Sequence, residues 1–161
     1  MKESLLMSSF TELLTIHDEL TELFLRHQEA LLQLDVPRAA VCLQDYERAL
    51  HAHIRVEEEL LLPIYERAGR IPGGPPEFFL GEHQRMREFV TRFHSRLAEL
   101  PTDPAQLPRG VIQLFDEEAT YKALCDHHDQ RERNLFFPAL DRVTTKEERA
   151  ALLSQCWLPV E

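Results

Sequence analysis

The chain has 161 residues, 43% of them hydrophobic, and this length and composition predict one domain with a core of its own, without disulfide bonds. Its formal net charge is −10 at pH 7 and no Lys/Arg-rich patch offsets it, so we expect no nucleic-acid partner, because a phosphate backbone would be repelled. The first ten residues hold no apolar stretch of signal-peptide length and no apolar run could span a bilayer, so we expect a cytoplasmic protein without a membrane partner.

Good helix formers dominate the sequence, and long β-branched runs are almost absent, which predicts an all-α fold. The first helix is expected over about residues 10–33, because Ser9 and Glu12 form a capping-box pattern and apolar residues then recur at helical spacing. The second helix is expected to begin at the cap Asp35, which precedes Pro37, and to stop at Gly69.

The second half of the chain predicts two more long helices and a short one. The Gly/Pro-rich stretch 71–76 precedes a helix over about 77–100, and the proline-rich stretch 101–108 precedes another that ends near residue 143. Thr145 and Glu148 form a cap for a short fifth helix over about 146–157. We therefore predict one domain over residues 1–161, with an up-down-up-down four-helix bundle at about 10–143.

The two halves of the chain share a repeated pattern, His-x-x-x-Glu-x-x-Leu-x-x-Pro, which begins at His53 and again at His128. A glutamate four residues after a histidine is weak evidence by itself, but chance does not readily repeat the whole constellation. The prolines of the two copies, Pro63 and Pro138, lie deep inside predicted helices. Each removes one backbone hydrogen bond, so we expect a kink just past each His-x-x-x-Glu.

The repeated pattern has the geometry of a metal-binding clamp. Residues four apart on a helix share a face and lie about 6 Å apart along its axis, so the histidine and the glutamate of each copy can reach one ion. Each half also carries a solitary histidine on the preceding predicted helix. A lone core histidine is more often hydrogen-bonded than metal-bound, but buried carboxylates cost several kcal/mol unless they are paired or bind metal. The predicted metal ligands are His17, His53, Glu57, His83, His128 and Glu132.

These motifs resemble the hemerythrin-like family, also called the cation-binding His-His-Glu domain, over nearly all of the predicted bundle. Oxygen-carrying members show His-x-x-x-His and then His-x-x-x-x-Asp in the second half, whereas here Arg87 stands four residues after His83 and Glu132 four after His128. The pattern is more similar to the branch that includes bacterial di-iron stress-repair proteins and eukaryotic iron-sensing domains. The resemblance implies a di-iron centre in the bundle core and argues against reversible oxygen carriage.

The implied cofactor is a pair of non-haem iron ions with an oxo or hydroxo bridge. If each ion takes two histidines and both glutamates bridge, one coordination position stays open on each ion. Iron is favoured because the ligands are imidazoles and carboxylates, while zinc and manganese remain alternatives. The cysteines form no Cys-x-x-Cys pair, so we expect reduced thiols at Cys42, Cys125 and Cys156.

The predicted function is the binding or reduction of a small diatomic or peroxide ligand, such as O2, nitric oxide or hydrogen peroxide, by Fe(II)/Fe(III) cycling. This function leaves open whether the protein is an enzyme. An iron or oxygen sensor, or an iron donor without turnover, is the alternative, and a metal-free helical adaptor is a third hypothesis. The sequence does not predict the oligomeric state.

Several residues near the proposed ligands have two interpretations. Glu58 is either an extra carboxylate for the metals or part of a solvated charge run. Glu118 and Tyr121 either orient the ligands by hydrogen bonding or simply lie near the bundle end. Arg87 either pairs with Glu57, with Glu132 or with an anionic ligand, or it reaches solvent. The remaining histidines are interpreted as surface or edge residues: His27, His51, His94 and His127.

Overall fold

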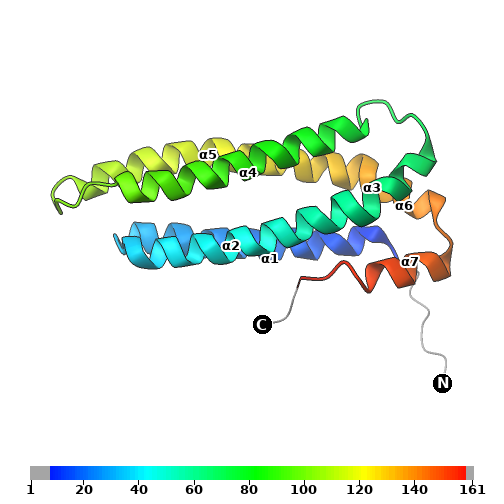
Figure 1. Ribbon diagram of the computed structural model, residues 1–161, viewed down its shortest axis with the longest axis horizontal. Helices are drawn as coiled ribbons and strands as arrows, with labels where there is room; N and C mark the ends of the chain where they lie inside the picture. The colour runs from blue at the N-terminus through cyan, green and yellow to red at the C-terminus, as the bar shows by residue number, and fades with distance from the viewer. Residues whose placement is uncertain (1–7, 159–161) are drawn as a thin grey trace, which may run out of the picture.

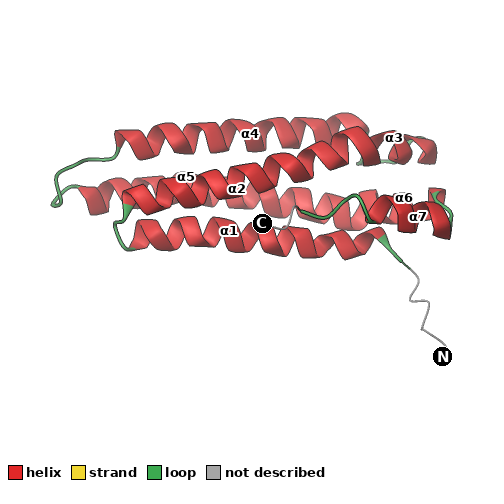
Figure 2. Cartoon of the chain, turned by 60° about the horizontal axis from the view of Figure 1, so that its bottom comes forward, coloured by secondary structure: helices red, strands yellow, loops and turns green. Residues whose placement is uncertain are grey.

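The computed structural model describes residues 8–158, and the regular structure within this range is entirely helical. Successive long helices run in opposite directions along an elongated bundle, with α1 and α2 on one side and α4 and α5 on the other (Figures 1 and 2). This arrangement confirms the predicted all-α, up-down-up-down four-helix bundle. The long helices are α1 (Leu14–Leu32), α2 (Val36–Val56), α4 (Pro76–Glu99) and α5 (Leu107–Arg131).

Shorter helical segments extend the long helices at one end of the bundle. A 3₁₀ turn precedes α1, and each His-x-x-x-Glu helix runs through a π-helical segment into a short α-helix. These segments are η1 (Phe10–Leu13), the π-helix η2 (Glu57–Leu61), α3 (Leu62–Tyr65), η3 (Glu66–Ala68), the π-helix η4 (Glu132–Phe136), α6 (Phe137–Val143) and α7 (Lys146–Leu153).

The predicted stop and start signals between the first helices lie where the chain changes direction. The Asp35 side chain accepts a hydrogen bond from the backbone N–H of Arg38 at 3.1 Å and so caps the beginning of α2. Gly69 ends η3 with a φ of 72°, a left-handed conformation that glycine adopts without a steric cost. Local chemistry therefore fixes these helix ends.

The short terminal helix is capped as predicted but ends earlier than predicted. The Thr145 hydroxyl accepts a hydrogen bond from the backbone N–H of Glu148 at 3.1 Å. Instead of continuing to about residue 157, α7 ends at Leu153. After Leu153 the chain is no longer helical, and the side chain of Cys156 is buried there.

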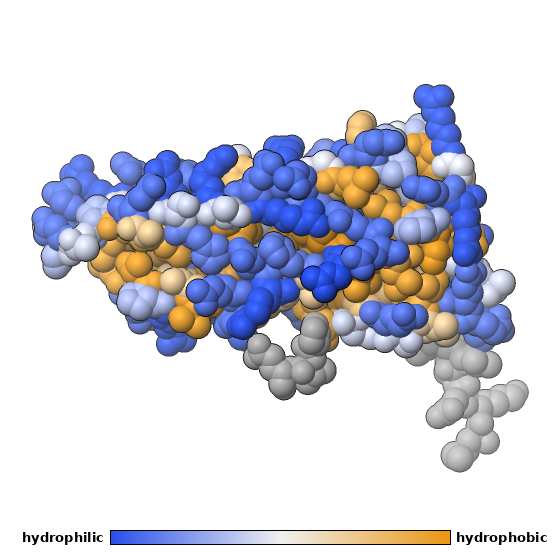
Figure 3. Space-filling model, viewed as in Figure 1, coloured by the Kyte–Doolittle hydropathy of each residue, from blue (hydrophilic) through white to orange (hydrophobic). Residues whose placement is uncertain are grey.

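A stripe of buried side chains runs along each long helix. On the face shown in Figure 3, polar side chains predominate, and hydrophobic side chains are visible between them toward both ends. None of the described helices is long and apolar enough to cross a membrane. Five of the six proposed ligands are buried like the apolar core, and His17 is half-buried on α1. Along α2 the stripe is Ala39, Leu43, Tyr46, Leu50 and His53, and along α5 it is Val111, Leu114, Glu118, Tyr121 and His128.

At the two places where kinks were predicted, the structure has π-helical segments, η2 and η4, which end just before the short helices containing the prolines. Proline lacks an N–H group, and a π-helical turn accommodates the interrupted hydrogen-bond ladder by inserting one residue. The inserted residue shifts the downstream stripe by one position. Leu61 and Phe136 are fully buried, whereas Leu60 and Leu135, the leucines of the repeated pattern, are only half-buried.

Candidate metal centre

The six predicted ligands come from both halves of the chain and converge in the bundle core. Both glutamates are the first residues of the π-helical segments, and each belongs to two groups of side chains. Within each group the potential ligand atoms lie within 4.8 Å of one another. One group is His17, His53, Glu57 and Glu132, and the other is Glu57, His83, His128 and Glu132.

The carboxylate of Glu57 lies between a histidine of each half. Its Oε1 is 2.7 Å from Nε2 of His53, which lies one helical turn earlier on the same helix. Its Oε2 is 3.0 Å from Nε2 of His83, on α4. One oxygen is therefore directed to each histidine pair.

Glu132 repeats this arrangement from the opposite side of the core. Its Oε1 contacts Nε2 of His128, one turn earlier on the same helix. Its Oε2 lies 3.8 Å from Nε2 of His17, on α1. Together the two glutamates connect both histidine pairs, as carboxylates that bridge two cations would.

Several of these buried atoms lack hydrogen-bond partners although polar atoms surround them. Among the described residues, Oε1 of Glu57 and both carboxylate oxygens of Glu132 have no partner with hydrogen-bond geometry. The side chains of both glutamates are fully buried, so this arrangement is costly unless something else binds the oxygens. The contacts are close but misaligned, as expected when lone pairs point to shared cations, so the residues fit a two-cation site.

The electrostatics of the two glutamates lead to the same conclusion. Burial raises the pKa of Glu132 well above its ordinary value, and the negative charge of Glu57 raises it further. Burial also opposes ionisation of Glu57, but the charge of the adjacent His53 and the hydrogen bond from His83 outweigh it and hold that pKa well below its ordinary value. Without a cation, burial and the negative charge of Glu57 therefore both oppose the ionisation of Glu132. Two carboxylates are stable there only with positive charge between them.

Comparison with known proteins agrees with this chemistry. A family model described as the hemerythrin HHE cation binding domain matches residues 8–140. The chain belongs to the hemerythrin family. The match extends over all four long helices and both His/Glu groups. No curated protein and no solved structure matches the chain.

In this hemerythrin domain, Glu58 supports a proposed ligand from outside the metal cluster. Its Oε1 lies 3.0 Å from Nδ1 of His83, so it can accept a hydrogen bond from this ring nitrogen. Its Oε2 accepts a hydrogen bond from Arg87 at 3.0 Å. Arg87 therefore does form an ion pair, but its partner is Glu58 rather than one of the predicted partners. Neither side chain belongs to the His/Glu groups.

Asp129 and Glu82 are functional candidates that the sequence reasoning missed. Asp129 lies 2.5 Å from Nδ1 of His17, and Glu82 lies 3.4 Å from Nδ1 of His128. Each acid is adjacent in sequence to a proposed ligand, since Asp129 follows His128 and Glu82 precedes His83. A step of one residue rotates a side chain by about 100°, which turns it from the core stripe toward the neighbouring helix. In the sequence, an acidic residue directly before or after a proposed histidine ligand is therefore the pattern that could have identified these two residues.

His27 is not a surface or edge residue, so that interpretation was wrong. Its side chain is fully buried, with Nδ1 2.9 Å from the carbonyl oxygen of Ala39 and Nε2 2.9 Å from the carboxylate of Glu118. The inward stripe of α1 is wide enough to include a position rotated about 80° from His17. The other three histidines lie as predicted, with His94 half-buried and His51 and His127 exposed.

Glu118 and Tyr121 contact other core residues rather than the proposed ligands. Glu118 pairs with His27, and the hydroxyl of Tyr121 contacts the hydroxyl of Tyr46. The two tyrosines occupy equivalent places in the repeat, each seven residues before the first histidine of a His-x-x-x-Glu. The hypothesis that Glu118 and Tyr121 orient the ligands therefore has no support among their contacts.

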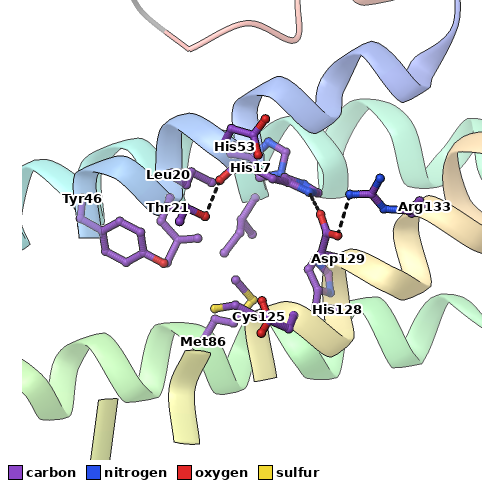
Figure 4. A pocket seen from close by; sticks show the side chains of 14 residues that line it. His17, Leu20, Thr21, Tyr46, His53, Met86, Cys125, His128, Asp129 and Arg133 are labelled. Atoms are coloured by element: carbon purple, nitrogen blue, oxygen red, sulfur yellow. Dashed lines mark hydrogen bonds and ion pairs between the residues drawn. The ribbon is translucent and has the colours of Figure 1, made fainter. Parts of the chain in front are cut away.

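A pocket of about 190 Å³ connects one side of the cluster with the surface (Figure 4). His17, His53 and His128 line it, but the remaining proposed ligands do not. Asp129 lies between His17 and the exposed Arg133 at the pocket wall, with a contact to each. Small molecules therefore have a route toward the side of the cluster formed by His17 and His53.

Proposed function

We propose that this hemerythrin domain holds two non-haem iron ions in its core. The supporting observation is that each buried glutamate presents one oxygen to each histidine pair, with three of the four oxygens lacking any hydrogen-bond partner among the described residues. His17 and His53 would hold one ion and His83 and His128 the other, with Glu57 and Glu132 shared. Iron suits this donor set because neither group contains a thiolate.

The proposed activity is the binding or reduction of O2, hydrogen peroxide or nitric oxide. Bound iron would supply Fe(II)/Fe(III) cycling. The protein would contribute two imidazoles and two carboxylates around each ion, which leaves room for an oxo or hydroxo bridge and a small ligand. The pocket beside His17 and His53 is large enough for such ligands and is partly apolar, with Leu20 and Met86 in its wall.

A sensor or iron-donor function is the second candidate, and the origin of the ligands supports it. The proposed ligands come from all four long helices or their π-helical extensions, so a bound metal would cross-link the bundle. Metal loss would leave two buried acidic groups facing each other, which couples metal occupancy to stability. In this case occupancy rather than turnover would be the output.

Anaerobic reconstitution with Fe(II) followed by controlled oxidation tests both candidates. We expect about two iron ions per chain by elemental analysis, in line with the two His/Glu groups, and an oxo-bridge absorption band. Catalytic consumption of peroxide or nitric oxide supports the enzyme, whereas stoichiometric reaction together with iron-dependent resistance to protease supports the sensor or donor. His53→Ala should lose iron, and the exposed neighbour His51 provides the matched control, His51→Ala. Purified protein that takes up no iron would contradict the proposal.

A further inference from the structure

Two names are useful for the two halves of the cluster. We call the side formed by His83 and His128 the inner position, and the side formed by His17 and His53 the pocket position. Building on the proposed di-metal function, we infer that the two positions have unequal affinities, so that the inner position fills first and the pocket position holds the exchangeable ion.

The first argument is the set of partners on the ring nitrogens that face away from the cluster. At the inner position both Nδ1 atoms have a carboxylate, Glu58 for His83 and Glu82 for His128. Such a carboxylate fixes the tautomer and the ring orientation and makes the ligating nitrogen more basic, and its removal typically costs about 10–100-fold in metal affinity.

The pocket position has only half of this support. Nδ1 of His17 contacts Asp129, but Nδ1 of His53 is buried and has no hydrogen-bond partner in the described part of the chain. His53 is therefore the one proposed histidine ligand whose Nδ1, the nitrogen facing away from the cluster, no described side chain holds. Its ring can rotate or change tautomer at lower cost than the other three rings.

One supporting carboxylate of the inner position, Glu82, is also better shielded than Asp129, whereas Glu58 is 23% exposed and resembles Asp129 in this respect. Glu82 is nearly buried and accepts a hydrogen bond from Nε of Arg131 at 2.9 Å. Asp129 is 26% exposed, and its second partner, Arg133, is itself 54% exposed. Solvent therefore screens the support of His17 more than the support of His128.

Solvent access is the third difference. The side chain of His17 is 14% exposed, compared with 1% for His83. The pocket reaches both histidines of the pocket position but only His128 of the inner position. An ion at the pocket position can therefore gain and lose water ligands without opening the bundle, which favours exchange.

Metal titration of the chelator-treated protein tests the inference, with Co(II) as the probe because its absorption reports coordination. We expect two successive binding steps that differ at least about tenfold in Kd, as expected from the loss of one carboxylate partner. Asp129→Asn should weaken the second step by about 10–100-fold and leave the first unchanged. Glu58→Gln should weaken the first step and so reduce the difference in Kd between the two steps.

Matched controls separate position from charge. Asp116→Asn removes the same charge from an exposed place on α5, and Glu59→Gln does so beside Glu58, so both should keep the wild-type isotherm. Two ions that bind with one affinity, or an Asp129→Asn variant that weakens the first step, would overturn the inference while leaving the di-metal site intact. If wild-type protein binds no Co(II) and no Fe(II), the proposed function itself fails.

Discussion

The hairpin of α1 and α2 and the hairpin of α4 and α5 each supply one solitary histidine and one His-x-x-x-Glu. In both hairpins the glutamate begins a π-helical segment, and in both a tyrosine precedes the clamp histidine by seven residues. The ligand set and the local backbone are therefore duplicated. The carboxylates that contact the Nδ1 atoms of the histidines are not duplicated, because they occupy different places in the two hairpins.

This difference shows that support crosses between the hairpins rather than repeating within them. Asp129 of the second hairpin contacts His17 of the first, and Glu58, beside the first clamp, contacts His83 of the second. Only Glu82 and His128 form such a pair within one hairpin, and His53 has no equivalent in the described structure. A duplicated ligand set can thus give two unequal metal positions.

The largest expected effect comes from removing either shared glutamate. Glu57→Ala and Glu132→Ala should each reduce metal content from two ions per chain to less than one, because each carboxylate presents one oxygen to each histidine pair. His17→Ala should lose mainly one ion. Elemental analysis after desalting measures the difference, with Glu59→Ala as the exposed control. Full two-metal occupancy in either glutamate variant would refute the shared-carboxylate arrangement.

Metal removal should have the next largest effect, because a bound ion cross-links both hairpins. Ligand at 1,000 times its Kd stabilises the native state by about 4 kcal/mol. For a chain of this size we therefore expect chelation to lower the Tm by roughly 10 °C, measured by scanning calorimetry. Equal Tm values with and without bound metal would show that the metals lie outside the folded core.

A smaller effect concerns the pH dependence of the metal-free protein, where the two glutamates should behave differently. The pKa of Glu132 is raised by burial and by the charge of Glu57, so the folded state holds a proton that the unfolded chain releases above its ordinary pKa of 4.5. Stability should therefore fall as the pH rises from 4.5 toward the raised pKa, by up to about 1.4 kcal/mol per pH unit.

This slope corresponds to a loss in Tm of roughly 3–6 °C per pH unit. Glu132→Gln should remove it, whereas Glu59→Gln should keep it. The pKa of Glu57 is lowered, so its stabilising contribution should disappear only as the pH falls. Metal displaces the proton of Glu132, and the loaded protein should become more stable as the pH rises. A metal-free protein with the opposite slope would show that Glu132 is ionised in the folded state.

Much of the bundle could be predicted because the sequence features that determine its helices are local. Apolar periodicity and cap residues such as Asp35 and Thr145 set the helix bounds, and the repeat identified six residues that the fold brings together. Their role as metal ligands stays a prediction, as do the single-domain assignment, the cytoplasmic location and the absence of a nucleic-acid partner.

The missed features depend on the arrangement of helices in space. A proline predicts a disturbed helix but not a π-helical turn, so the burial of Phe136 in place of Leu135 could not be predicted from a 3.6-residue period. Spacing along one helix also does not show which neighbour an off-stripe side chain meets. The contact between Asp129 and His17 spans 112 residues of sequence, and only the packing of α5 against α1 determines it.

The smallest expected effect concerns Arg87, which hydrogen-bonds Glu58 and so reaches the inner position only through that carboxylate and His83. The Arg87 side chain is 34% exposed, and an ion pair of this kind contributes about 0–1 kcal/mol, which corresponds to a change in affinity of less than about fivefold. Arg87→Gln should therefore weaken the first metal-binding step by less than Glu58→Gln does, and it should leave the second step unchanged. The same titration with Co(II) measures both, and exposed Arg85 offers a matched control in Arg85→Gln. If Arg87→Gln weakened binding more than Glu58→Gln, Arg87 would act on the metals directly, and Glu58 would not be the residue that connects it to His83.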